Sequence, residues 1–264
     1  MINRAIEIQK NSGTKELISR IPPFLKWRVK NLRSGLRCLI FNYSGKRPII
    51  SMSTYLGNIE LEVDPSWRRY NEMASGNMYE PMLQQELINA LSEDDVFYNI
   101  GSRWGIFSLI ADKCGVDTNK IHNFEANKRN YEILLRNSPD RMNSTRAFVG
   151  NNQSNGHVIL DNYSKKHQPP TVLKMDIEGG ELNALLGAEN ILKRSSPELF
   201  VEVHPEYISD LGQSQSELIG LLKKSGYEIQ ITDHELVESG WADLDDIETP
   251  SVGTYMIHAF KNES

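Results

Sequence analysis

The sequence predicts an α/β protein in which a basic, helical N-terminal extension precedes a doubly wound, mostly parallel sheet with an antiparallel pair of strands at its edge. From residue 94 onward, apolar segments of strand length alternate with segments of helical periodicity, which is typical of parallel βαβ units. Two strand segments near the end have no helical pattern between them. Residues 1–50 hold 11 basic and 2 acidic residues, whereas the remainder holds 18 basic and 33 acidic residues. We therefore expect a helical and β-hairpin extension over residues 1–78 and the sheet domain over residues 79–264.

The elements follow in order along the chain. Residues 1–45 are expected to be helical, residues 47–63 to form two short strands around Gly57-Asn58, and residues 64–90 to be helical. Strands are then expected at residues 96–100, 121–124, 144–149, 171–175 and 199–203, with helices after the first, second, fourth and fifth. The last of these helices has a capping-box pattern at Ser214 and Glu217. The antiparallel pair is expected at residues 227–231 and 254–260.

The composition excludes several classes of protein. No run approaches the roughly 18 apolar residues of a membrane-spanning helix, and no signal peptide is apparent at the N-terminus. The two cysteines, Cys38 and Cys114, have no metal-binding spacing and fit a reducing, cytoplasmic setting. The acidic main body argues against nucleic-acid binding, which needs a basic surface.

A glycine turn follows the first strand of the sheet domain. Gly101 permits a tight turn close to a ligand, and Gly105 permits close packing of the next helix. The spacing lacks the middle glycine of a dinucleotide-binding loop, which favours a cofactor without phosphates. Glu125 ends the second strand, where a carboxylate can accept hydrogen bonds from ribose hydroxyls. Asn151, after the third strand, is expected near the adenine.

Charged residues gather at the ends of two later strands. Lys174, Asp176 and Glu178 alternate at the end of one strand, and Glu202 and His204 repeat this spacing at the end of the next. Because the ends of adjacent parallel strands meet at one edge, these acid–base groups are a candidate catalytic site.

The segment Lys174-Met175-Asp176-Ile177-Glu178-Gly179-Gly180-Glu181, followed by Leu185-Leu186-Gly187-Ala188, resembles the signature of the FkbM family of S-adenosylmethionine-dependent methyltransferases. Tyr79-Glu80-Pro81, Phe124-Glu125 and Val201-Glu202-Val203-His204-Pro205 match other landmarks of that family. The resemblance covers about residues 79–260. It implies a class I methyltransferase (Rossmann-like) fold and O-methylation of hydroxyl groups, commonly on sugars or polyketides.

One departure concerns the glycine turn. The family usually has Asp-x-Gly-Ala-Asn-x-Gly, where this chain has Asn99-Ile100-Gly101-Ser102-Arg103-Trp104-Gly105. Asn99 replaces an acid that helps to place the methionine end of the cofactor, and Arg103 replaces a small amide. The residues expected to bind S-adenosylmethionine are Glu80, Asn99, Gly101, Ser102, Gly105, Glu125, Asn151 and Asp176.

We expect His204 to act as the base that removes the hydroxyl proton, oriented by Glu202 or Asp176, with Glu178 in the same pocket. The alternative for His204 is a purely structural role at the end of a strand. A second alternative uses Asp176, Glu178 and Glu202 as ligands of a magnesium-like ion, but the resemblance implies no metal, and we expect none. Two further functions stay open, a nicotinamide-dependent oxidoreductase and a non-catalytic member of the fold.

The N-terminal extension carries an amphipathic pattern. Within residues 24–41, an apolar stripe at helical spacing (Leu25, Val29, Leu32, Leu36) lies beside a basic stripe (Lys26, Lys30, Arg33, Arg37). We expect the apolar stripe to pack on the sheet domain or on a second subunit of a homo-oligomer. Weak contact with the inner face of a membrane is the alternative. The expected partner is a small-molecule or glycan acceptor, with no nucleic acid.

Overall fold

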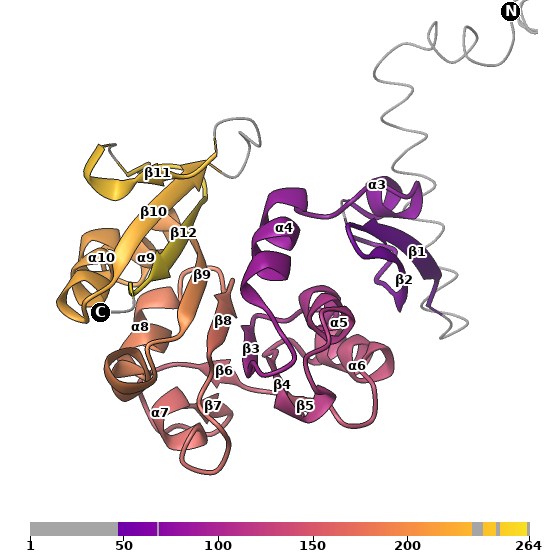
Figure 1. Cartoon of the computed structure of the whole chain (residues 1–264), viewed down its shortest axis with the longest axis horizontal. Coiled ribbons are helices and arrows are strands. Elements are labelled where there is room, and N and C mark those ends of the chain that lie inside the picture. The colour runs from indigo at the N-terminus through magenta and orange to yellow at the C-terminus, as the bar shows by residue number, and fades with distance from the viewer. Residues whose placement is uncertain (1–46, 68, 234–239, 247–248, 263–264) are drawn as a thin grey trace, which may run out of the picture. The chain divides into compact units, whose positions relative to one another are not determined.

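The computed structural model describes residues 47–67, 69–233, 240–246 and 249–262 (Figure 1). The chain divides into two compact units, Met1–Pro48 with Asp64–Asn71, and Ile49–Val63 with Glu72–Ser264. We call the second the sheet unit, and the site described below belongs to it. The helix predicted over residues 1–45, with the stripes at residues 24–41, lies outside the described residues. In the part of the chain that the structure describes, no helix has the length and apolar character needed to cross a membrane.

The sheet unit is built on eight strands in the order β11-β10-β12-β9-β8-β3-β4-β5. Strands β5, β4, β3, β8 and β9 are parallel, and β12 pairs antiparallel with both β9 and β10. The strands are β3 (Phe97–Ile100), β4 (Ile121–Phe124), β5 (Asn143–Thr145), β8 (Val172–Met175), β9 (Glu198–Val203), β10 (Glu228–Asp233), β11 (Ala242–Asp243) and β12 (Tyr255–Phe260). This arrangement confirms the predicted doubly wound α/β sheet, which is mostly parallel with antiparallel pairing at one side.

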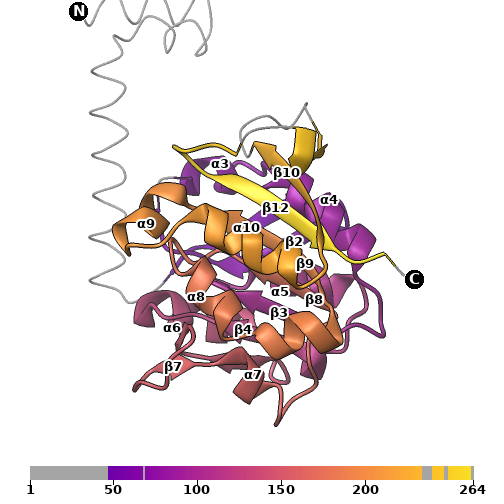
Figure 2. The same cartoon turned by 90° about the vertical axis from the view of Figure 1, so that its left-hand side faces the viewer.

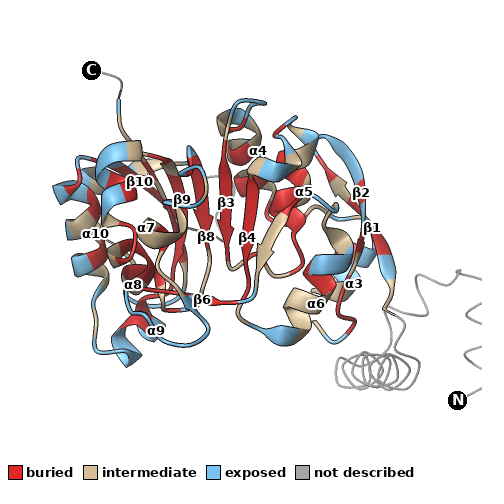
Figure 3. Cartoon of the chain, turned by 90° about the horizontal axis from the view of Figure 1, so that it is seen from below, coloured by how far each residue is buried: buried red, intermediate tan, exposed pale blue. Residues whose placement is uncertain are grey.

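Helices cover both faces of this sheet. Figures 1 and 3 show α4 (Pro81–Ala90), α5 (Ile106–Lys113) and α6 (Lys128–Asn137) on one side. Figure 2 looks onto the other side, which is covered by α7 (Leu160–Tyr163), α8 (Glu181–Leu186) and α10 (Gln215–Lys224). Short helices also occur at α3 (Tyr70–Ala74), η1 (Thr118–Lys120), η2 (Ile191–Ser195), α9 (Pro205–Asp210) and η3 (Leu244–Asp246). Every residue of β3 and β8 is buried, as expected for central strands covered on both faces (Figure 3).

Several local predictions are confirmed. The capping box of α10 is formed, because the Glu217 N–H donates to Ser214 Oγ and the Ser214 N–H donates to Glu217 Oε2. The hairpin of β1 (Ile49–Thr54) and β2 (Gly57–Glu62) is also formed. Its turn residues are Tyr55 and Leu56 rather than Gly57-Asn58, and Gly57 instead takes the positive φ that begins the second strand.

Two local predictions are wrong. Residues 64–90 are not continuously helical, since only α3 and α4 form and an irregular segment separates them. Residues 144–149 are not one strand. The chain leaves the main sheet after β5, and β6 (Phe148–Val149) pairs instead with β7 (His157–Val158) in a separate two-stranded sheet.

Within the sheet unit, polar contacts join the β1–β2 hairpin to the end of α6. The Asn137 amide accepts from the Glu62 N–H and donates to the Glu62 C=O, and Arg136 Nε lies 2.6 Å from Glu62 Oε2. These contacts agree with the grouping of residues 49–63 in the same compact unit as the main sheet. The expected boundary between an extension over residues 1–78 and a sheet domain over residues 79–264 stays a prediction.

Candidate active site

The carboxyl ends of β3, β4 and β8 border a cavity of about 510 Å³. A doubly wound sheet places its ligand at this edge, because the strand ends and the helix N-termini that follow them converge there. The cavity is lined by main-chain and side-chain atoms from the glycine turn, from the end of β4, from β6 and from the segment after β8. The lining residues are Ile100, Gly101, Arg103, Phe124, Glu125, Ala126, Asn127, Asn130, Ala147, Phe148, Val149, Asp176, Ile177, Glu178 and Gly180.

Gly101 brings the glycine turn against the end of β8. Its φ is +74°, and a Cβ at this position would lie 1.7 Å from the carbonyl oxygen of Asp176. The N–H groups of Gly101 and Ser102 both donate to the Phe124 carbonyl at the end of β4. The missing side chain therefore lets three strand ends meet, and this contact sets the floor of the cavity.

Glu125 lies at the cavity wall, as the sequence predicts, and is 7% exposed. Its Oε2 accepts from the Arg103 N–H at 2.8 Å and its Oε1 accepts from the Asn127 N–H at 2.7 Å. Burial raises the pKa of the Glu125 carboxyl above its usual value, against the lowering effect of these two N–H groups. Each carboxylate oxygen keeps a second lone pair with which it can accept from a ligand hydroxyl.

Three residues of the glycine turn that were expected to bind the cofactor, Asn99, Ser102 and Gly105, lie outside the cavity lining. Asn99 is fully buried and donates to Ser108 Oγ on α5, so its side chain joins β3 to that helix. Ser102 donates its hydroxyl to the Phe124 carbonyl. Gly105 begins α5 with φ +85°, and a Cβ there would lie 2.8 Å from Leu134 Cδ1, which fits the packing role predicted for it.

Two other predicted cofactor residues lie apart from the lining. Asn151 is exposed in the loop after β6 and is not part of the cavity wall. Glu80 is buried at the N-terminus of α4 with a left-handed φ of 47°. Burial, the hydrogen bond and charge of Glu80 and the charge of Asp176 together raise the pKa of the Tyr79 hydroxyl well above its usual value. Glu80 and Asp176 therefore both act on the Tyr79 hydroxyl.

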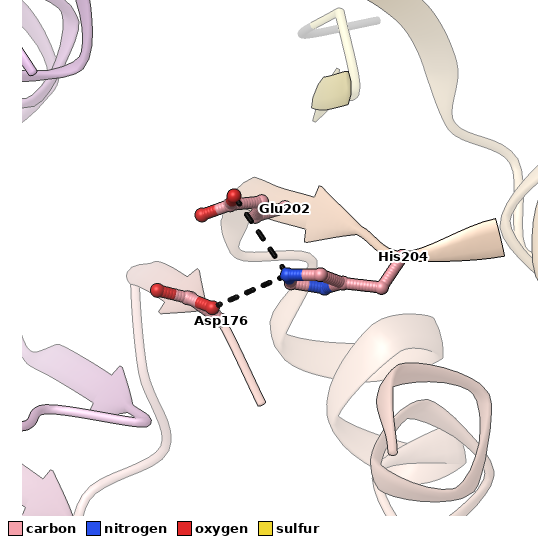
Figure 4. Close-up of side chains that lie close together, drawn as sticks. All are labelled: Asp176, Glu202 and His204. Atoms are coloured by element: carbon pink, nitrogen blue, oxygen red, sulfur yellow. Dashed lines mark ion pairs between the residues drawn. The ribbon is translucent and has the colours of Figure 1, made fainter. Parts of the chain in front are cut away.

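Three of the four predicted catalytic residues come together beyond the end of β8 (Figure 4). The Nε2 atom of His204 lies 3.9 Å from Asp176 Oδ1 and 3.8 Å from Glu202 Oε1. Asp176 is half-buried and reaches the cavity, whereas Glu202 and His204 are each 8% exposed. Lys174 is buried beneath Asp176, with its Nζ 3.5 Å from Asp176 Oδ2 and 5.1 Å from the centre of the Phe107 ring.

Glu178, the fourth, lies outside this group. Strand β8 ends at Met175, so the alternation that places Asp176 does not extend to Glu178. Glu178 is exposed with φ +51° and contributes to the cavity wall. Asp176 and Glu178 therefore both line the cavity, whereas Glu202 and His204 do not, and the cluster beside the cavity consists of Asp176, Glu202 and His204.

A further residue, Glu181, completes the cluster and had no role in the sequence-based site. It is fully buried at the first position of α8, and its Oε1 lies 2.7 Å from His204 Nδ1 and accepts from the Gly179 N–H. Glu181, rather than Glu202 or Asp176, holds the imidazole ring. Its place as the last residue of the strand-end motif was the available signal. Burial lowers the pKa of His204, but the hydrogen bond to Glu181 and the charges of Glu181, Glu202 and Asp176 outweigh it and raise that pKa above its usual value.

Residues 157–229 match the sequence model of the methyltransferase FkbM domain. The matched segment includes β8, α8 and β9, and so the whole of the cluster. A comparison with curated proteins gives no match.

Among solved structures, the chain is similar to methyltransferase FkbM from Methylobacillus flagellatus KT, with 20% identity, a TM-score of 0.46, and coverage of 64% of this chain and 44% of that one. It is also similar to precorrin-6y C5,15-methyltransferase from Geobacter metallireducens GS-15, with 16% identity, a TM-score of 0.45, and coverage of 69% and 87%. An rRNA methylase from Streptococcus thermophilus has 14% identity, a TM-score of 0.44, and coverage of 69% and 95%. The chain thus spans less than half the length of the first of these proteins. The match over residues 157–229 confirms the resemblance predicted from the strand-end motif: this segment of the chain is similar to the methyltransferase FkbM domain.

Proposed function

We propose that this chain transfers a methyl group from S-adenosylmethionine to a hydroxyl group of a sugar, glycan or small-molecule acceptor. One observation carries the proposal. The cavity at the carboxyl ends of the strands has Glu125 on its wall and Asp176 at the point where it meets the cluster with Glu202 and His204. Glu125 and one carboxylate of the cluster, Asp176, thus line the same cavity, and Glu202 and His204 lie next to Asp176.

The residues present fit the proposed cofactor. Glu125 would accept hydrogen bonds from the ribose hydroxyls with the lone pairs that the two backbone N–H groups leave over. Apolar groups of Phe124, Ala147 and Val149 line the same cavity and suit a purine ring. The turn after β3 has no glycine between Gly101 and Gly105, which is consistent with a cofactor that brings no pyrophosphate to the start of α5.

Asn99 does not oppose this function. The change from an acid to an amide removes a charge, but the Asn99 amide nitrogen donates to Ser108 and the side chain lies outside the cavity lining. Asp176, which does line the cavity, supplies a negative charge that attracts a sulfonium. Cofactor binding therefore depends on Glu125 and Asp176 rather than on Asn99.

Methyl transfer forms a bond between the acceptor oxygen and the methyl carbon as the bond from that carbon to sulfur breaks. The hydroxyl proton has to leave to a nearby acceptor, because an alcohol does not ionise unaided at neutral pH. In the neutral ring of His204, donation from Nδ1 to Glu181 leaves the lone pair on Nε2, which faces Asp176 and Glu202. The cluster can therefore orient a hydroxyl and receive its proton.

Calorimetry on the full chain tests the cofactor. We expect S-adenosylmethionine to bind and NAD not to bind, which separates this function from the nicotinamide-dependent alternative. Glu125→Gln should weaken S-adenosylmethionine binding by about 1.5–3 kcal/mol, the usual contribution of hydrogen bonds to a charged group. Glu93→Gln, an exposed change before β3, is the matched control. Unchanged affinity in a folded Glu125→Gln variant would contradict the ribose assignment. Incubation of the full chain with cell metabolites or glycans and a labelled methyl donor would then identify the acceptor.

A further inference from the structure

We propose that Asp176, Glu202 and His204 form a binding site for one divalent metal ion, with an imidazole nitrogen and two carboxylate oxygens as ligands. The inference deepens the proposed methyl transfer and rests on it for the role of the ion, although the site itself can be tested separately. It replaces the metal-free expectation drawn from the sequence. It also differs from the alternative with Asp176, Glu178 and Glu202, because His204 takes the place of Glu178.

The positions of the donor atoms fit one shared ion. One oxygen of each carboxylate and one nitrogen of His204 lie within 4.8 Å of one another, and Nε2 lies 3.8–3.9 Å from the two oxygens (Figure 4). Metal–ligand distances of about 2.0–2.2 Å place neighbouring ligand atoms roughly 3.0–3.4 Å apart. Binding therefore needs the two distances from His204 to shorten by about 0.4–0.9 Å, and the most widely separated pair of donor atoms to close by up to about 1.4–1.8 Å, through rotation about side-chain torsions.

The orientation of His204 is the second, independent observation. Its side chain is nine-tenths buried, and Nε2 lies beyond hydrogen-bonding distance of both carboxylates that it faces. Glu181 holds the opposite nitrogen at 2.7 Å, and the Gly179 N–H in turn holds Glu181. A carboxylate on one ring nitrogen, with the other nitrogen aimed at open ligand positions, is the arrangement that orients metal-binding histidines.

The charge balance also favours a cation. Asp176, Glu181 and Glu202 bring three carboxylates to a largely buried site, and Lys174 contacts one of them. Carboxylates brought together in a buried site repel one another, and a bound divalent ion would relieve that repulsion. A proton and a divalent ion would compete for the lone pair of His204 Nε2.

The ligand types indicate which ion and what it does. One imidazole with two carboxylates suits Mn²⁺ or Zn²⁺ better than Mg²⁺, which prefers oxygen ligands throughout. Three protein ligands leave positions open for an acceptor hydroxyl. An oxygen bound to such an ion loses its proton at a lower pH, so the acceptor oxygen would reach the methyl group as a better nucleophile. The proton then passes to a carboxylate of the cluster or to water.

Titration of the full chain, stripped with EDTA, with Mn²⁺ alone tests the site by electron paramagnetic resonance. We expect the signal of free Mn²⁺ to be suppressed up to one ion per chain, with competition from Zn²⁺. His204→Gln and Glu202→Gln should each weaken binding by at least tenfold. Glu181→Gln should weaken it by about 10- to 100-fold through loss of ligand orientation.

His258→Gln is the matched control, because His258 Nε2 lies 2.6 Å from the single carboxylate of Glu198, away from the cluster. It should bind Mn²⁺ like the parent chain. Circular dichroism identifies any variant that does not fold, and Asp176→Asn then supplies a second removal of a ligand. Absence of stoichiometric Mn²⁺ and Zn²⁺ binding, or equal binding by a folded His204→Gln variant, would overturn the proposal. If the stripped chain binds S-adenosylmethionine but no metal, the metal site alone fails. If it binds Mn²⁺ but no S-adenosylmethionine, the proposed function fails instead.

Discussion

The contact of Gly101 with the end of β8 gives a quantitative prediction for Gly101→Ala. The added Cβ would meet the Asp176 carbonyl oxygen at 1.7 Å and its carbonyl carbon at 2.7 Å. These atoms are backbone, so no side-chain rotation relieves the overlap. A non-glycine residue at the left-handed φ of +74° costs about 1–2 kcal/mol, and forced displacement of a packed neighbour costs a further 1–3 kcal/mol. We expect the free energy of unfolding to fall by about 2–5 kcal/mol.

Urea unfolding followed by circular dichroism measures this loss, and Gly212→Ala is the control. Gly212 has a similar φ of +71°, but no heavy atom lies within 4 Å of the position of its added Cβ. The control should therefore lose only the conformational part, about 1–2 kcal/mol. Equal losses in the two variants would refute the inference that close approach to Asp176, rather than φ alone, requires glycine at position 101.

Three other predictions concern stability and surface binding. Burial and the charge of His167 lower the pKa of His122 to about 4. Below pH 6.5 His122 therefore binds a proton in the unfolded chain before it does so in the folded chain, which favours unfolding. The free energy of unfolding should be about 2–3 kcal/mol lower at pH 4.5 than at pH 7. Urea unfolding at the two pH values should show a smaller loss for His122→Asn, and an equal loss would show that His122 is not responsible. Ser196 ends η2 with φ +50°, so Ser196→Gly should raise the free energy of unfolding by up to about 1 kcal/mol, and an unchanged or lower melting temperature would contradict this. If residues 24–41 bind membranes, the chain should co-sediment with anionic vesicles at low salt, and a variant with Lys26, Lys30, Arg33 and Arg37 changed to serine should not.

The strands and most helices could be predicted from local sequence, because apolar periodicity and caps such as Ser214 and Glu217 act within a few residues. The position of β12 between β9 and β10 could not, since strand order depends on pairing between segments far apart in the chain. The break between β5 and β6 depends likewise on the later segment β7.

In the candidate site, too, some residues could be predicted from local sequence and others could not. Asp176, Glu202 and His204 were predicted because parallel strand ends meet at one edge of the sheet. Glu178 was misplaced because the alternation of β8 was extended past Met175, where the backbone turns to a positive φ. The strand-end motif could draw attention to Glu181, but its contact with His204 depends on how α8 packs against the residue after β9, which the motif does not report.

The insertion of β12 between β9 and β10 has a consequence for the order of events during synthesis. Within the described chain, β10 and β11 reach the main sheet only through β12, which the ribosome makes after both of them. Until residues 255–260 emerge, β9 is an edge strand whose outer peptide groups are open to pairing with another nascent chain. During synthesis, the main sheet can therefore extend in its native order as far as β9 until β12 is available. A ribosome that stalls within the segment between β10 and β12 would release a chain with an aggregation-prone edge immediately beside Glu202.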